Sequence, residues 1–218
     1  MKKENGVTSG FQKRDVHGYV LAGGGSTRFG RDKALAEIDG KPMVLRMREL
    51  LVTVVTGGVN LVAAPGKYSN LGLSTLTDRW PGEGPLGGII TALRATEKTR
   101  NGAEWNLLVG CDMPFLTLEW LSYLVERSLV SRAEVVVPRS ANGLEPLCAC
   151  WRSSGTRKLQ RAFDDGVRKV TEAMKQLQME IIDESDWKRF DSAGRLFWNM
   201  NTAADYDEAK KILEAERV

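Results

Sequence analysis

The sequence predicts a single α/β domain in which helices cover both faces of a mainly parallel β-sheet. Two observations lead to this prediction. Short apolar runs typical of buried strands alternate with segments whose apolar residues recur at helical spacing. Several of the apolar runs in the N-terminal half are followed by a glycine-rich loop or by a carboxylate. This is typical of the carboxyl ends of parallel strands in three-layer α/β folds.

Length and composition agree with one ordinary domain. The chain has 218 residues, 42% of them hydrophobic and 27% charged, which is enough to bury a full core. No apolar run could span a bilayer, and the net charge of +3 comes without a basic block interleaved with aromatic residues. The three cysteines lack metal-ligand spacing, and the single histidine cannot complete a zinc site. We expect a cytoplasmic protein that binds neither membranes nor nucleic acid. We also expect it to contain no disulfide bonds and no structural zinc.

The polar first segment predicts a division of the chain into a tail and one domain. Residues 1–17 carry both signs of charge and contain no apolar segment of a secretory signal. We expect these residues to form a disordered tail. Residues 18–218 then form the domain.

A predicted phosphate-binding loop occupies residues 18–33. The strand-like run at 19–22 ends in three consecutive glycines, which let backbone N–H groups converge on an anion. Arg28 and Lys33 add positive charge. The dinucleotide-binding pattern fails because Arg28 replaces its third glycine, and the Walker A pattern fails because Arg31 and Asp32 stand where it needs lysine and a hydroxyl. The alternative is a strand-to-helix turn that binds no ligand.

A second glycine-rich loop follows a predicted strand at residues 73–78. That strand ends in Asp78, and Gly84, Pro85 and the glycines at 87–88 open a helix. Proline suits the first helical turn, and a helix N-terminus attracts anions. The alternative is a tight helix start beside a solvated Asp78.

The third candidate site follows the apolar run at residues 105–110, which delivers Asp112 to the carboxyl edge of the sheet. One or two carboxylates with substrate phosphates commonly hold Mg²⁺, so Asp112 is a candidate magnesium ligand. A solvated capping residue is the alternative. We expect Cys111 to be a small buried residue, since no histidine is near enough in sequence to activate it as a nucleophile.

The other elements follow from the same patterns. Helices are expected at residues 43–51, 117–130, 156–163, 171–177 and 203–215. Strands are expected at residues 59–64, 133–138, 145–151, 179–182 and 196–202. On the last strand Asn199 and Asn201 would project to the same side. Thr117 and Thr202 are expected to cap helices, the latter with Asp205 in a capping box.

Four motifs in this order resemble the nucleotidyltransferases of glycosyltransferase-A-like fold, most closely the molybdenum cofactor guanylyltransferases. The resemblance extends from Tyr19 to about Ala209. The motifs are the Leu-Ala-Gly-Gly run from Leu21 with the Asp-Lys-Ala run from Asp32, Gly-Pro-Leu-Gly-Gly from Gly84, Cys-Asp-Met-Pro from Cys111, and Asn-Met-Asn-Thr-Ala-Ala-Asp from Asn199. Related cytidylyltransferases more often have Ala-Ala-Gly in the first motif, which favours GTP.

The resemblance implies a Rossmann-like three-layer domain that transfers GMP from GTP to the terminal phosphate of molybdopterin or Mo-molybdopterin and releases pyrophosphate. Proteins of molybdenum cofactor biosynthesis, or acceptor proteins, are the partners it implies. Such an acceptor is largely ionised at neutral pH, so no general base is needed. The implied nucleotide-binding residues are Leu21, Ala22, Gly23, Gly24, Lys33, Asp78 and Asp112. The implied catalytic residues are Arg28, Lys33 and Asp112, and Asp112 would hold Mg²⁺.

Acceptor binding is the role that the resemblance implies for four further residues, Arg168, Lys169, Asn199 and Asn201. Ala63 stands near a position where the guanylyltransferases often have an asparagine that contacts the nucleotide. Two alternatives stay open. The chain could be a cytidylyltransferase or another small-molecule nucleotidyltransferase with the same loop, or a nucleotide-binding module without catalytic activity.

Overall fold

The computed structural model describes residues 16–23, 32–99 and 104–216. The strands are β1 Val16–Leu21, β2 Glu37–Ile38, β3 Lys41–Pro42, β4 Val59–Ala63, β5 Thr75–Thr77, β6 Trp105–Gly110, β7 Val135–Ser140, β8 Gly143–Leu144, β9 Cys148–Arg152 and β10 Met179–Ile182. The α-helices are α1 Met43–Val54, α2 Pro85–Glu97, α3 Leu118–Val130, α4 Thr156–Asp164, α5 Val170–Ala173, α6 Glu184–Trp187 and α7 Ala203–Ala215. Short 3₁₀ helices include η1, Lys33–Leu35.

One mixed sheet organises the domain, with the strand order β10-β7-β9-β6-β1-β4-β5. β1 lies at its centre and pairs in parallel with both β4 and β6. β9 is antiparallel to β6 and to β7, because the chain turns back through β8 and inserts β9 between them. The expected mainly parallel sheet is confirmed, and the carboxyl ends of β1, β4, β5 and β6 share one edge.

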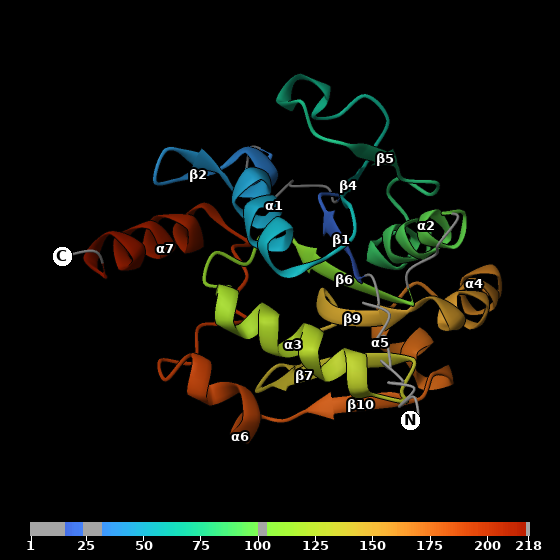
Figure 1. Cartoon of the computed structure of the whole chain (residues 1–218). Helices are drawn as coiled ribbons and strands as arrows, with labels where there is room; N and C mark the ends of the chain where they lie inside the picture. Colours follow the sequence, from blue (N-terminus) through green and yellow to red (C-terminus); the bar gives the residue numbers. More distant parts are fainter. Residues whose placement is uncertain (1–15, 24–31, 100–103, 217–218) are drawn as a thin grey trace, which may run out of the picture.

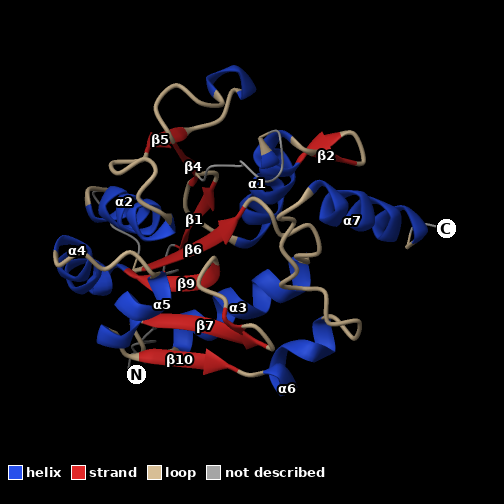
Figure 2. Ribbon diagram, turned by 180° about the vertical axis from the view of Figure 1, so that it is seen from behind, coloured by secondary structure: helices blue, strands red, loops and turns tan. Residues whose placement is uncertain are grey.

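Helices cover both faces of this sheet, which confirms the three-layer architecture (Figure 1). α1 and α3 lie on one face, whereas α2, α4 and α5 lie on the other. Figure 2 shows the same layers from behind, with α7 beside β2 at the margin of the domain. The Tyr206 hydroxyl of α7 donates a hydrogen bond to the Glu37 carbonyl of β2 at 2.6 Å.

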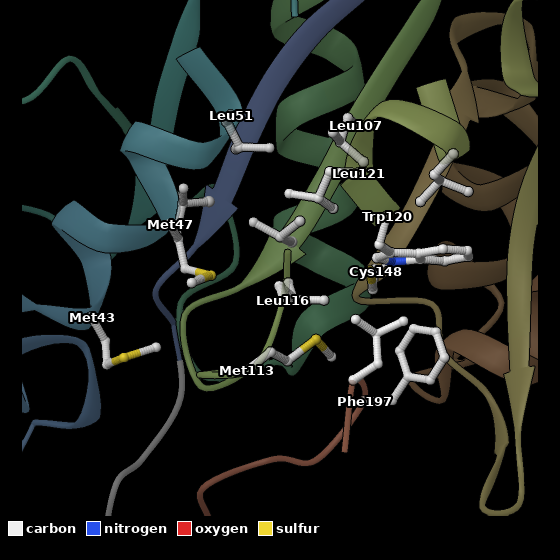
Figure 3. Close-up of a cluster of buried hydrophobic side chains, with 14 of the residues drawn as sticks. Met43, Met47, Leu51, Leu107, Met113, Leu116, Trp120, Leu121, Cys148 and Phe197 are labelled. Atoms are coloured by element: carbon white, nitrogen blue, oxygen red, sulfur yellow. Dashed lines mark hydrogen bonds between the residues drawn. The ribbon is translucent and has the colours of Figure 1, made fainter. Parts of the chain in front are cut away.

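The larger core cluster fills the space between the sheet, α1 and α3 (Figure 3). Met47 and Leu51 of α1 and Trp120 of α3 are fully buried there. The Trp120 indole N–H donates to Cys148 Sγ at 3.2 Å, so the buried ring has a polar partner. Burial raises the pKa of Cys148 to about 12, which keeps its thiol neutral. Cys148 therefore acts here as a packing residue.

The predicted helix caps are confirmed. The Thr117 side chain accepts a hydrogen bond from the Trp120 backbone N–H at the start of α3. Thr202 and Asp205 form a capping box at the start of α7. Pro85 occupies the first turn of α2, and the preceding Gly84 has φ +88°, a backbone conformation that favours glycine.

The structure corrects the predicted start of the first strand and one predicted strand. β1 begins at Val16, which is 1% exposed, so the strand extends into the segment expected to be a tail. Residues 1–15 lie outside the described part of the chain. The strand expected at 196–202 is a loop, because Phe197 and Met200 are buried as individual anchors. The Met200 N–H donates to the Asp112 carbonyl at 2.9 Å, which attaches this loop to the end of β6.

No helix among residues 16–23, 32–99 and 104–216 combines the length and hydropathy needed to cross a bilayer.

Candidate functional site

A pocket of about 300 Å³ lies at the edge where β1, β4 and β6 end. This is the edge at which open α/β sheets bind ligands. Its charged lining residues are Asp32, Lys33, Asp78 and Asp112. Its apolar and glycine lining includes Leu21, Ala22, Gly23, Val62, Ala64, Gly82, Gly84, Gly88, Cys111 and Leu147. The volume is at the lower end of the range for small-molecule sites.

Asp78, which lines the pocket just after β5, connects this strand to α2. Asp78 Oδ1 accepts hydrogen bonds from the Trp80 N–H at 3.0 Å and from the Thr91 hydroxyl at 3.3 Å. The carboxylate is 9% exposed and is therefore held in one position. A Cβ built on Gly23 would stand 3.9 Å from Asp78 Oδ2, so the first glycine of the phosphate-loop motif lies directly beside this carboxylate.

Lys33 connects three parts of the chain that are distant in sequence. It is the first residue of η1, and its ammonium donates to Asn201 Oδ1 at 2.9 Å. The same ammonium lies 3.7 Å from Asp112 Oδ2. The C-terminal loop and the end of β6 thus meet at one positive charge on the wall of the pocket.

Asp112 lies where the backbone of β6 permits a close approach. A Cβ at Gly110 would stand 2.9 Å from Asp112 Oδ1, so glycine is required at that position for this carboxylate orientation. Burial raises the pKa of Asp112, and the neighbouring Lys33 opposes that effect only in part. Burial also raises the pKa of the adjacent Cys111, so this thiol stays protonated, in agreement with its predicted lack of a nucleophilic role.

Asp32 is the main residue of the pocket that sequence reasoning missed. Its carboxylate caps η1 through the Ala34 N–H, accepts from the Lys67 ammonium at 3.0 Å, and accepts from the Tyr68 hydroxyl at 2.8 and 2.9 Å. Burial opposes ionisation, but the hydrogen bonds from Lys67 and Tyr68 hold the pKa of Asp32 below its ordinary value. Asp32 is therefore an ionised anchor for the segment that carries Lys33.

Tyr68 carried no sequence signal for this role. It lies 36 residues from Asp32 in sequence. It adopts φ +61°, which is uncommon for a residue other than glycine, and its side chain is 6% exposed. The left-handed backbone directs the ring inward, so that its hydroxyl reaches Asp32.

Most of the predicted nucleotide-binding residues line the pocket, and the others lie outside the described part of the chain or beside the pocket. Of the expected nucleotide-binding residues, Leu21, Ala22, Gly23, Lys33, Asp78 and Asp112 line this one pocket. Gly24 and Arg28 lie outside the described residues. Ala63 is fully buried in β4, and the next residue, Ala64, lines the pocket instead.

The four predicted acceptor-binding residues differ in their hydrogen-bond partners and in their positions in the fold. Asn201 reaches Lys33, whereas the Asn199 amide donates to the Phe197 carbonyl at 3.2 Å, so the two amides have different partners. The segment forms no strand, and nothing therefore imposes the period of two. Arg168 donates to Glu83 at 2.6 Å beside the second glycine-rich loop, and Lys169 is the exposed residue before α5.

The donor set of the pocket fits one Mg²⁺ held mainly by its substrate. Among the described residues, no three His, Cys, Asp or Glu side chains gather into a metal-binding group. Mg²⁺ commonly takes one or two carboxylates and completes its shell with phosphates and water. Hydrogen bonds occupy both carboxylate oxygens of Asp32 and Oδ1 of Asp78, whereas the ion pair of Asp112 with Lys33 is longer, at 3.7 Å. Asp112 is the carboxylate best suited to a metal.

Comparisons with known proteins cover most of the chain, including the segments that carry Lys33, Asp78 and Asp112. A family model described as "MobA-like NTP transferase domain" matches residues 18–179. A protein of Pyrococcus furiosus named "Probable molybdenum cofactor guanylyltransferase" is 32% identical, over 91% of this chain and 98% of that protein. A protein of Desulfosudis oleivorans named "Molybdenum cofactor guanylyltransferase" is 28% identical, over 93% of this chain and 98% of that protein.

A solved structure shares the fold. The crystal structure of molybdopterin-guanine dinucleotide biosynthesis protein A from Archaeoglobus fulgidus superposes with a TM-score of 0.78. It is 24% identical, and the match covers 91% of this chain and 99% of that one. The likeness therefore shows that the two proteins share one fold over most of their length.

Proposed function

The chain belongs to the MobA-like NTP transferase family, and we propose that it transfers GMP from GTP to the terminal phosphate of molybdopterin or Mo-molybdopterin, releasing pyrophosphate. Its domain has the glycosyltransferase-A-like nucleotidyltransferase fold that the resemblance implied. The choice of guanine and of molybdopterin rests on the names of the relatives. Proteins that supply or receive the cofactor would be its protein partners.

The observation that carries the proposal is the convergence of Asp112 and Asn201 on the Lys33 ammonium, with Lys33 and Asp112 lining the pocket. Phosphoryl and nucleotidyl transfer depend mainly on alignment and charge neutralisation. A fixed ammonium beside a carboxylate suited to Mg²⁺ supplies both. The apolar and glycine floor, from Leu21 to Gly23 and around Gly88, leaves room for the nucleoside.

In the proposed reaction, an oxygen of the acceptor phosphate forms a bond to the α-phosphorus of GTP. The bond from that phosphorus to the oxygen bridging towards the β-phosphorus breaks, and pyrophosphate leaves with the electron pair. The acceptor is a phosphate monoester whose second pKa is near 6, so it needs no general base at neutral pH. Lys33 would neutralise phosphate charge, and Mg²⁺, when bound, would neutralise more.

Asp78 and Asn201 would orient the two substrates. The oxygens of Asp78 would accept hydrogen bonds from guanine N–H groups or from a ribose hydroxyl. Asn201 already accepts from Lys33 and keeps its amide N–H₂ as a donor for the acceptor phosphate. Arg168, tied to Glu83, would support the glycine-rich loop rather than meet the acceptor directly.

The test is pyrophosphate release by the full chain with Mg²⁺, measured with GTP or CTP and with or without molybdopterin. We expect release only when GTP and molybdopterin are both present. Release with CTP and not with GTP would contradict the guanine assignment and make the chain a cytidylyltransferase. GTP binding without release, with molybdopterin present, would contradict transfer to this acceptor and favour a nucleotide-binding module.

A further inference from the structure

A second hollow, of about 430 Å³, lies between α2 and α4 on the outer surface of the helical layer. Figures 1 and 2 both place these two helices side by side. Five cations line this hollow, which we call the cationic groove: Arg79, Arg94, Lys98, Arg157 and Arg161. Two carboxylates, Glu97 and Asp164, also line it, which leaves a local excess of positive charge.

The cationic groove is separate from the substrate pocket. α2 begins at the pocket, where Gly84, Pro85 and Gly88 line it, and reaches the groove only in its second half. Arg94 follows Gly84 by ten positions, about 15 Å along the helix axis at 1.5 Å per residue. The two hollows share no lining residue.

Two cations close to the groove are paired with carboxylates, whereas, among the described residues, the groove cations are not. Lys158, next to Arg157 on α4, pairs with Glu134 at 2.7 Å, and Arg168, beyond the end of α4, pairs with Glu83 at 2.6 Å. In contrast, none of the five groove cations forms a salt bridge with a carboxylate in the described part of the chain. The excess charge of the groove is therefore not neutralised by its neighbours.

The spacing of the groove cations makes this arrangement unfavourable when nothing is bound. Arg94 of α2 and Lys98, the C-cap residue that follows α2, are four residues apart, and Arg157 and Arg161 are four residues apart on α4. Residues at this spacing lie on the same side of a helix, where like charges repel each other. Both pairs line one hollow, so an anion placed between the helices would relieve the repulsion within each pair and across the groove.

We propose that the cationic groove is a second anion site that binds a molecule carrying two or more phosphoryl groups. Four of its five cations are arginines, whose planar guanidinium groups match phosphate oxygens in pairs. Its volume is in the range of small-molecule sites, which favours an oligophosphate over a protein partner. Inorganic oligophosphates and nucleoside triphosphates share this chemistry, and the experiment separates them.

The experiment titrates the full chain by calorimetry with tripolyphosphate, GTP or guanosine. The groove variant is Arg94→Gln/Arg161→Gln. Its matched control is Lys158→Gln/Lys210→Gln, which also removes two positive charges, both outside the groove. Lys33→Ala identifies binding in the substrate pocket. Thermal unfolding confirms that each variant is folded, and Arg79→Gln/Arg157→Gln replaces the first groove variant if that one does not fold.

We expect the wild type to bind two equivalents of tripolyphosphate. The groove variant should weaken one of the two sites at least about tenfold, because each arginine lost removes charge-assisted hydrogen bonds. The control should stay within about twofold of the wild type, and Lys33→Ala should affect only the other site. Equal effects on tripolyphosphate and GTP would identify the phosphate chain as the recognised group, and a larger effect on GTP would identify a nucleotide as the ligand.

Three results would overturn the proposal. In the first, the wild type binds only one equivalent of tripolyphosphate, and Lys33→Ala abolishes this binding. In the second, the groove variant binds tripolyphosphate as tightly as its control variant. In the third, the groove variant no longer binds guanosine, which has no phosphate. Because the readout is binding without an acceptor, failure here leaves the proposed transfer reaction untouched. Conversely, failure of that reaction would not change the binding expected in the cationic groove.

Discussion

Two carboxylates on the wall of the pocket, Asp32 and Asp112, differ in almost every respect that governs their chemistry. Asp32 accepts from Lys67, from Tyr68 and from a backbone N–H, and its pKa lies below the ordinary value. Asp112 has Lys33 as its ion-pair partner at 3.7 Å, and burial holds its pKa above the ordinary value. The folded state therefore stabilises the charge of Asp32 and opposes the charge of Asp112.

This difference indicates that Asp32 stabilises the fold, whereas Asp112 is available to bind a cation. A carboxylate whose lone pairs are taken by fixed donors gains little from a metal ion. A buried carboxylate whose ionised form is unfavourable gains the most when a cation arrives. Active sites often contain groups whose environment opposes their charge. The predictions below test whether this division between Asp32 and Asp112 holds.

The largest effect is expected from Asp112→Asn. We expect the rate of pyrophosphate release to fall on the order of 10³-fold. The variant lacks the carboxylate suited to Mg²⁺ and therefore also loses the neutralisation of phosphate charge that the bound ion would supply. The midpoint of thermal unfolding, measured in EDTA, should stay the same or rise, because a charge that burial opposes has been removed. A variant that loses activity and stability together would remove the distinction between the two carboxylates.

The next effect is expected from Lys33→Ala. Release should fall on the order of 10²-fold, since a positioned charge at the phosphates is lost. Lys67→Ala is the matched control, because it removes a nearby ammonium that pairs with Asp32 and does not line the pocket. Turnover by Lys33→Ala close to that of Lys67→Ala would exclude a special role for Lys33.

Asp32→Asn should act mainly on stability. We expect a loss of about 1–3 kcal/mol in the free energy of unfolding at pH 7, from charge-assisted hydrogen bonds that the amide replaces poorly. The native pKa is lowered, so this stability is present above the unfolded-state pKa near 4 and is lost as the pH falls through the lower native pKa. The difference between the variant and the wild type should therefore shrink below about pH 4. Denaturant unfolding at pH 7 and pH 3 measures it, and a difference that grows on acidification would contradict this sign.

The smallest effect is expected from Tyr68→Phe. This change keeps the buried ring and removes the hydroxyl that donates to Asp32 at 2.8 Å. About 1 kcal/mol of unfolding free energy should be lost, and the effect should largely disappear in an Asp32→Asn background, because both changes act on one contact. Full additivity of the two changes in a double-mutant cycle would show that Tyr68 does not act through Asp32.

Much of the fold could be predicted because local patterns and their burial agree along most of the chain. The apolar run of β6 is buried at every position, and the amphipathic pattern of α3 matches the face that it presents to the sheet. The caps at Thr117 and Thr202 needed only short-range chemistry. The strand expected at 196–202 was wrong, because the buried apolar residues of this loop, Leu196, Phe197 and Met200, fill core positions without pairing to a strand.

The sequence by itself determined the three-layer α/β domain, the two glycine-rich segments and the presence of Lys33, Asp78 and Asp112 at the functional edge. These features depend on periodicity, on glycine spacing and on the position of polar residues just after buried strands. Only the tertiary structure decided which of these residues meet and what each contact does. Asn201 reaches Lys33 across 168 residues, Tyr68 makes Asp32 a structural anchor, and the basic residues of α4 face α2 in a groove away from the substrate pocket. Such contacts join residues that are far apart in the sequence and form only when the chain folds. The burial of each side chain and the pKa of each titratable group depend on these contacts, so the sequence alone does not give them.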